Sequence, residues 1–406
     1  MRLLSIFLLL AACAPHARDY DFPRPVDTST RPIATQTKRS YAFDDGALTF
    51  DNEFDGARLN GVTRRGIDTF VVSILPENEP INSSPWYALR IRTRQPRDLV
   101  VRLAYPPDVY HRYHPKLSTD GEVWTPVDST RLQLGPDTSS LAIDLSLPAG
   151  THYLAAQEVI TATDVSQWLG TTFRQPYARL DIAGNSALGR PIPVLRLARE
   201  SRYAGRPMVV FFSRQHPPEV TGYLALQAML EAMIAHPRIE EFLDRYQVMV
   251  FPLINPDGVD LGHWRHTAGG IDANRDWAYY RQPETRRVAD YVVRKSRRND
   301  APVLLGMDFH STYQDVYYTF NATLPPSVLP GFKDDWLRAI ERKLGGGFAV
   351  NEEAEPLGRP TSAGWFRTQF NAEALTYEIG DATDRAFVRR KGQASAEALI
   401  ELLLAR

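Results

Sequence analysis

The feature that most constrains this chain is an alternation of short apolar runs with helical patterns in its second half. Apolar residues recur at helical spacing over residues 220–235, a proline opens a second helical stretch at 283–298, and a third, 336–344, ends at three glycines. The runs between them have the length and composition of strands: residues 195–198, 208–213, 248–253 and 303–308. Such alternation indicates an α/β domain with a largely buried sheet, which we expect over residues 161–406.

The region before it has a different pattern. Short strands, such as residues 69–74, 86–91 and 99–103, are separated by turn residues at close intervals. This spacing is typical of an all-β sandwich, which we expect over residues 40–160. No cluster of catalytic side chains is evident in it.

The amino terminus carries a leader pattern. Arg2 supplies a positive charge, residues 3–10 are apolar, and the sequence LAAC ends at Cys13. This is typical of a secretory signal, and its end resembles the lipobox of bacterial lipoproteins, which are cut before the cysteine and acylated on it. We expect a signal peptide over residues 1–12 and a lipidated flexible tether over 13–39, rich in Pro, Arg and Thr. The alternative is a leader with a chance cysteine beside an ordinary cleavage site.

Acyl chains on Cys13 would hold the mature protein to a membrane. We therefore expect a lipoprotein of the bacterial cell envelope, and Ala14 after the cysteine favours the outer membrane, facing the periplasm. The formal net charge of −1 gives no indication of a nucleic-acid partner.

Polar residues that suit a metal follow two of the predicted strands. His216 and Glu219 form an H-x-x-E pair directly after the strand at 208–213, where open α/β sheets place ligand sites. His310 follows the strand at 303–308. A catalytic zinc uses three protein ligands and leaves a fourth position for water, so these three residues are a candidate zinc site.

Other candidates lie on loops and on a late strand. Glu378 is a carboxylate that can take a proton from zinc-bound water and deliver it to a leaving amine. Arg265 can stabilise an oxyanion, and the pair Asn274-Arg275 can grip a carboxylate. Taken singly, each has an ordinary structural explanation.

The order of the motifs decides between these readings. H-x-x-E, N-P-D-G, W-R, D-x-N-R, D-x-H-S and T-x-E follow one another, each at the end of an element. In this respect the chain resembles the M14 metallocarboxypeptidases, the zinc carboxypeptidases, from about Tyr177 to the carboxyl terminus. The β-rich region, with FDGA from Phe54 and Trp86-Tyr87, is similar to the amino-terminal domain of the cytosolic carboxypeptidase subfamily. The resemblance implies an α/β/α catalytic domain with a mixed central sheet.

The resemblance also implies the chemistry. One Zn²⁺ per chain would be bound by His216, Glu219 and His310, with Glu378 as the catalytic base. Arg265 would polarise the scissile carbonyl.

Further roles concern the substrate and the outer support of the metal. The resemblance implies that Asn274 and Arg275 hold the terminal carboxylate of a peptide, which makes the enzyme an exopeptidase. Asp272 would orient His216, and Ser311 would contact the substrate backbone.

The specificity pocket departs from the pancreatic pattern. Residues 355–359 contain no tyrosine where the pancreatic enzymes have a mobile tyrosine, and residues 361–364 are small and neutral. Arg359 or Arg367 would favour an acidic end if either reached the pocket; the alternative is that both are surface residues.

Three alternatives to peptide trimming remain open at this point. The same zinc site would serve hydrolysis of stem-peptide amide bonds in peptidoglycan, which an envelope location favours. A non-catalytic binding module is a second alternative, and a zinc esterase or deacylase is a third.

Overall fold

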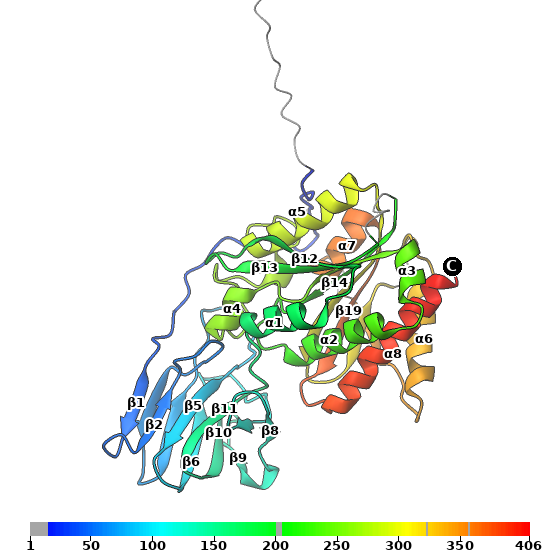
Figure 1. The fold of residues 1–406 in the computed structure, drawn as a ribbon. Coiled ribbons are helices and arrows are strands. Elements are labelled where there is room, and N and C mark those ends of the chain that lie inside the picture. The colour runs from blue at the N-terminus through cyan, green and yellow to red at the C-terminus, as the bar shows by residue number, and fades with distance from the viewer. Residues whose placement is uncertain (1–14, 200–204, 322–323, 356–357) are drawn as a thin grey trace, which may run out of the picture.

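The computed structural model describes residues 15–199, 205–321, 324–355 and 358–406, which form a β-sandwich and an α/β domain (Figure 1). The expected signal peptide, Cys13 and Ala14 lie outside the described residues. Within the described ranges, no helix has the length and apolar character to cross a membrane.

Two sheets form the β-sandwich, as predicted. Their strand orders are β1-β2-β5-β11-β7-β8 and β3-β4-β6-β10-β9. Side chains alternate between core and solvent along β6, where Leu99, Val101 and Leu103 point into the core. The elements are β1 (Ser40–Phe43), β2 (Leu48–Asp51), β3 (Gly61–Arg64), β4 (Thr69–Ser73), β5 (Ala88–Thr93), β6 (Arg97–Ala104), β7 (Lys116–Ser118), β8 (Thr125–Pro126), η1 (Ser129–Arg131), β9 (Leu132–Leu134), β10 (Ser140–Leu147) and β11 (Gly150–Ala155).

The second domain is built on an eight-stranded mixed sheet with the order β12-β13-β15-β14-β16-β19-β17-β18. The four central strands, β15-β14-β16-β19, are parallel. Outside them, β13 pairs antiparallel with β15, β12 with β13, and β17 with β19. The predicted mixed sheet is therefore confirmed. The strands are β12 (Ala178–Asn185), β13 (Pro191–Leu197), β14 (Met208–Ser213), β15 (Gln247–Phe251), β16 (Val303–Thr312), β17 (Val316–Thr319), β18 (Glu352–Ala354) and β19 (Glu373–Gly380).

Helices cover both faces of this sheet (Figure 1). One core packs α1, α2, α3, α6 and α8 against the sheet, and the other packs α5 and α7. Strand β14 serves both, because Val209 and Phe211 enter the first core while Val210 and Phe212 enter the second. The helices are α1 (Ala162–Thr172), α2 (Val220–Ala235), α3 (Ile239–Arg245), α4 (Pro256–Leu261), η3 (Ala273–Arg275), α5 (Pro283–Arg298), α6 (Phe332–Leu344), α7 (Ser362–Phe370) and α8 (Arg385–Leu404).

The parallel centre gathers the polar motifs at one edge of the sheet. Strands β14, β16 and β19 are neighbours and run the same way, so their carboxyl ends meet. His310 and Glu378 are register partners on adjacent strands. Helix α2 approaches this edge closely, since a Cβ on Gly222 would lie 2.3 Å from the carbonyl oxygen of His310. Glycine is therefore required there.

Residues 15–39 differ from the free tether that the composition predicts. Their backbone donates hydrogen bonds to the α/β domain from Tyr20 to Ala278 (3.3 Å), from Arg24 to Gly358 (3.1 Å) and from Arg31 to Gly269 (2.8 Å). Thr28 is fully buried. An extended segment leaves its backbone groups free for partners, and loops of the α/β domain supply them.

Candidate functional site

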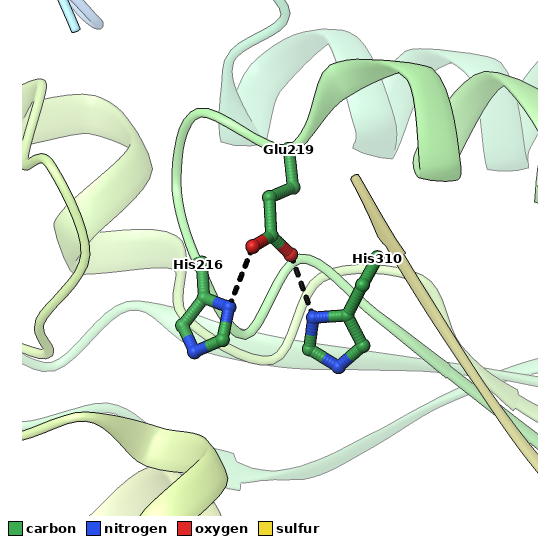
Figure 2. A group of neighbouring side chains, drawn as sticks. All are labelled: His216, Glu219 and His310. Carbon is green, nitrogen blue, oxygen red and sulfur yellow. Dashed lines mark hydrogen bonds and ion pairs between the residues drawn. The ribbon is translucent and has the colours of Figure 1, made fainter. Parts of the chain in front are cut away.

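Three buried side chains meet at the edge where β14 and β16 end (Figure 2). His216 lies in the loop after β14, Glu219 lies at the start of α2, and His310 lies in β16. The carboxylate of Glu219 sits between the imidazoles, 2.8 Å from Nδ1 of His216 and 2.6 Å from Nδ1 of His310. Their ligand atoms all lie within 4.8 Å of one another. The predicted meeting of these residues is confirmed.

This donor set fits zinc. Two imidazole nitrogens and one carboxylate are common ligands of a catalytic zinc. Burial acts to raise the pKa of Glu219, but the charges of His216 and His310 hold that pKa well below its ordinary value. The carboxylate therefore stays ionised, as a metal ligand must be.

Each histidine is oriented by a further carboxylate behind it. Nε2 of His216 lies 2.8 Å from Oδ1 of Asp272, and Nε2 of His310 lies 2.6 Å from Oδ2 of Asp308. Hydrogen bonds at Nε2 leave both Nδ1 atoms to face a cation. Sequence reasoning named Asp272 but not Asp308. The signal was present, because residues i and i+2 of a strand lie on one face, so Asp308 in the D-x-H motif of β16 accompanies His310.

The substitution Asp308→Asn tests this support. Asparagine can still accept the hydrogen bond from His310, so the variant removes mainly the negative charge. We expect zinc affinity to fall about 10- to 100-fold, the usual effect of losing such a partner. Competition with a chromogenic chelator measures it. The matched control is Asp51→Asn, since Asp51 is a fully buried carboxylate bound to Arg90 in the β-sandwich. An affinity unchanged in Asp308→Asn, or equally reduced in the control, would contradict this role.

Glu378 faces the cluster from β19. Its Oε2 atom is buried and has no partner among the described residues. Burial raises the pKa of Glu378 to about 8; the charge of Glu219 adds to the rise, while His310, Arg112 and Arg265 oppose it. A divalent cation at the ligands would lower this pKa again. The position suits a group that exchanges protons beside the metal.

Arg265 lies on the loop between α4 and η3. Its Nε donates to Oδ2 of Asp272 at 2.7 Å, so Asp272 joins the guanidinium to His216. The residue is 8% exposed. This bond fixes one edge of the planar group.

One cavity of about 240 Å³ is lined by the three ligands and by Glu378, Arg265, Asn274, Arg275 and Ser311. Asn274 accepts from the backbone of Ser362 at 2.8 Å. Among the described residues, the guanidinium of Arg275 makes one hydrogen bond, from Nη1 to the carbonyl oxygen of Asn274 (2.8 Å). The hydroxyl oxygen of Ser311 accepts hydrogen bonds from the hydroxyl of Thr221 and from the backbone N–H of Gly222, both in α2. Ser311 therefore holds the helix as well as lining the cavity.

The β-sandwich supplies part of the lining, which sequence reasoning missed. Arg112 and Asn82 come from that domain. Arg112 donates to Asp381 at 2.7 Å and to the carbonyl oxygen of Ser311 at 3.1 Å, so it links the two domains at the cavity. No local pattern marks it, because its partners lie 269 and 199 residues away in sequence.

The region expected to set specificity contains an acid rather than an arginine. Among the described residues, the cavity lining includes Glu355, Thr361 and Thr376, but neither Arg359 nor Arg367. Arg367 instead donates to the carbonyl oxygen of Pro325 at 2.7 Å. Glu355 accepts from both threonines, and its burial raises its pKa.

Comparison with known families agrees with this geometry. The family described as zinc carboxypeptidase (Peptidase M14) matches residues 166–343, a stretch that holds all three candidate ligands. Residues 166–343 therefore match a zinc carboxypeptidase domain. The predicted kinship with cytosolic carboxypeptidases is confirmed as well. Cytosolic carboxypeptidase 2 of Danio rerio is 24% identical over 294 residues, covering 65% of this chain and 40% of the relative. Cytosolic carboxypeptidase 2 of Mus musculus is 22% identical over 268 residues, covering 58% of this chain and 30% of the relative. The chain therefore spans less than half the length of these relatives.

Solved structures match both domains of this chain. A metallo-carboxypeptidase from Burkholderia cenocepacia has a TM-score of 0.71 at 19% identity, covering 88% of this chain and 99% of that one. A metallo-carboxypeptidase from Pseudomonas aeruginosa, solved with (2-guanidinoethylmercapto)succinic acid, has a TM-score of 0.69 at 17% identity, covering 87% and 98%. At these identities the matches show a shared fold, and the fold includes the β-sandwich.

Proposed function

We propose that this chain is a zinc-dependent carboxypeptidase that removes the C-terminal residue from peptides. The observation that carries the proposal is the convergence, in one cavity, of the His-Glu-His cluster with Glu378 and the guanidinium groups of Arg265 and Arg275. A metal site, a proton carrier and two anion-binding groups are the parts that hydrolysis of a C-terminal peptide bond needs.

The residues would divide the work as follows. His216, Glu219 and His310 would hold zinc, which polarises a carbonyl and makes water a stronger acid. Glu378 takes the proton of the attacking water on Oε2, which has no partner in the part of the chain that the structure describes, and delivers it to the leaving amine. Arg265, steadied by Asp272, offers its outer nitrogens to the negative charge that develops on the carbonyl oxygen.

Arg275 would define the enzyme as an exopeptidase. We expect Arg275→Met to raise KM for peptides with a free carboxyl terminus by about 10- to 100-fold, because hydrogen bonds to charged groups contribute about 1.5–3 kcal/mol. Its kcat should change less. Steady-state kinetics on a blocked dipeptide and its C-terminal amide measure the effect, and the variant should lose the preference for the free acid.

The control for Arg275→Met is Arg367→Met, which removes an arginine that binds Pro325 outside the cavity lining. Its KM should match that of the unaltered enzyme. If Arg275→Met retained the preference for a free carboxylate, another residue would bind the substrate terminus.

The function itself is tested by incubating zinc-loaded protein with blocked dipeptides and longer peptides and identifying the products by end-group analysis. We expect single C-terminal residues to be released, and release to stop after chelation and return with zinc. A protein that takes up no zinc favours the binding-module alternative. A fully loaded protein that cleaves esters or acyl groups but no peptide favours the esterase or deacylase.

We further propose that the protein is a lipoprotein of the bacterial envelope, acylated on Cys13 and facing the periplasm at the outer membrane. The support is the leader pattern of residues 1–13 and Ala14. Metabolic labelling with a fatty acid tests it: label should enter the unaltered protein and be absent from Cys13→Ser.

That location favours peptidoglycan stem peptides as the competing substrate. The same zinc and the same proton carrier would cleave their amide bonds. Purified muropeptides and ordinary peptides should be assayed side by side. Cleavage of ordinary peptides with no change in muropeptides would exclude the cell-wall substrate.

A further inference from the structure

The loop that carries Arg265 is held through its backbone by one carboxylate of the other domain. Three successive amides converge on Glu77: the N–H of Trp264 donates to Oε2 at 2.8 Å, while those of Arg265 and His266 donate to Oε1 at 3.0 and 2.7 Å. Three donors on one carboxylate define the path of the backbone at Arg265.

Glu77 belongs to the β-sandwich, in the loop that joins β4 to β5, and it is fully buried. Its own segment is anchored, because Arg58 donates from Nε to the carbonyl oxygen of Leu75 at 2.8 Å. Burial alone would raise the pKa of Glu77, but His263, the backbone amides and Arg58 bring it below its ordinary value. The group is therefore an ionised acceptor.

The rest of the loop is fastened to the same domain. Trp264 lies in the hydrophobic core of the β-sandwich, and its Nε1 donates to the carbonyl oxygen of Trp86 at 3.1 Å. Gly262 has φ of +65°, and a Cβ there would lie 2.4 Å from the carbonyl oxygen of Ala57. This close approach allows no side chain. The loop and the β-sandwich thus form one packed unit.

The position of this loop affects the candidate metal ligand His216 through two hydrogen bonds. The guanidinium of Arg265 is joined to Asp272, and Asp272 is joined to His216. A shift of the backbone at residue 265 would move the guanidinium relative to the scissile carbonyl. A misplacement of about 1 Å at a reacting centre can lower the rate about 100-fold.

We propose that the β-sandwich is a working part of the active site and that its Glu77 is the residue that positions Arg265. The proposal rests on the role given to Arg265 in the proposed function. Glu77 does not line the substrate cavity, so it acts through the loop rather than on the substrate.

The test is Glu77→Gln in the full chain. Glutamine keeps the size of the side chain but removes its charge and places an amide where backbone N–H groups point. We expect kcat to fall about 10- to 100-fold, with KM within about threefold of the unaltered enzyme because the loss falls on the transition state. Zinc content should be unchanged. Amide hydrogen exchange, followed by mass spectrometry, should become faster in the peptide that contains residues 264–266.

Asp51→Asn is the matched control, since Asp51 is a fully buried carboxylate of the same domain and accepts hydrogen bonds from Arg90 and Arg92. It should leave kcat and the exchange of residues 264–266 unchanged. Glu77→Asp, which keeps the charge but withdraws it by one methylene, should give an intermediate kcat, and it carries the test if Glu77→Gln does not fold.

Unchanged kcat in the Glu77 variants, or an equal loss in Asp51→Asn, would overturn the proposal. The exchange measurement stands apart from activity. If the unaltered protein hydrolyses no peptide, the proposed function fails, whereas unchanged exchange at residues 264–266 in Glu77→Gln shows that Glu77 does not hold the loop.

Discussion

Replacing Glu378 with glutamine will lower kcat by about 10³- to 10⁴-fold, the upper part of the range for general acid–base catalysis, and will leave the zinc content at one ion per chain. Glutamine has the same shape but cannot take a proton from water. Glu378 is not a member of the ligand cluster, so the metal should remain. Initial rates on a blocked dipeptide, together with zinc analysis of the same preparation, give both quantities.

The same strand offers the control. Glu373 lies in β19 and is buried, and burial raises its pKa as it does for Glu378. It accepts from Ser327, outside the cavity lining. Glu373→Gln should therefore turn over at the normal rate. A Glu378→Gln enzyme with near-normal kcat would require a different base.

The sequence predicted the ligand cluster because its signal is local. His216 and Glu219 lie within one turn after β14, and His310 lies in β16. Parallel neighbouring strands bring their carboxyl ends to one edge, so two motifs distant in sequence were expected to meet there. Each motif is short, and their order along the chain identified them as one site.

What the sequence did not predict depends on partners that lie far away. Glu77 and the amide of Arg265 are 188 residues apart, and an isolated glutamate in a loop carries no pattern that names its partner. The same holds for Arg112 and Asp381, which are 269 residues apart. The β-sandwich showed no catalytic cluster because its contributions to the site are single side chains that complete groups in the other domain.

Two further elements escaped prediction for reasons of packing. Helix α8 runs from Arg385 to Leu404 and buries small residues as well as large ones. Gly392 lets it approach α2, since a Cβ there would lie 2.7 Å from the carbonyl oxygen of Ala225. Residues 15–39 have the composition of a free linker, but their backbone N–H groups donate to carbonyl oxygens of the α/β domain.

The second large effect is expected at Glu219. In Glu219→Gln the central carboxylate loses the charge that both imidazoles face at 2.8 and 2.6 Å. Loss of a carboxylate that only orients a metal ligand lowers metal affinity by up to about 100-fold. Because Glu219 is itself a candidate ligand, we expect Glu219→Gln to lower zinc affinity by more than that. Activity should fall with the metal and return in part at high zinc concentration. Chelator competition and metal analysis measure the affinity.

Thermal unfolding also distinguishes the role of Glu219 from that of Glu378. A ligand that binds the folded state stabilises it by about 2.7 kcal/mol when its concentration is 100 times its dissociation constant. Zinc at that level should raise the Tm of the unaltered protein and of Glu378→Gln equally, because both keep the three ligands. The same zinc concentration should leave the Tm of Glu219→Gln nearly unchanged. If zinc stabilised Glu219→Gln as strongly as the unaltered protein, the metal would be bound elsewhere, and the positions given to Glu378 and Arg265 around it would have no basis.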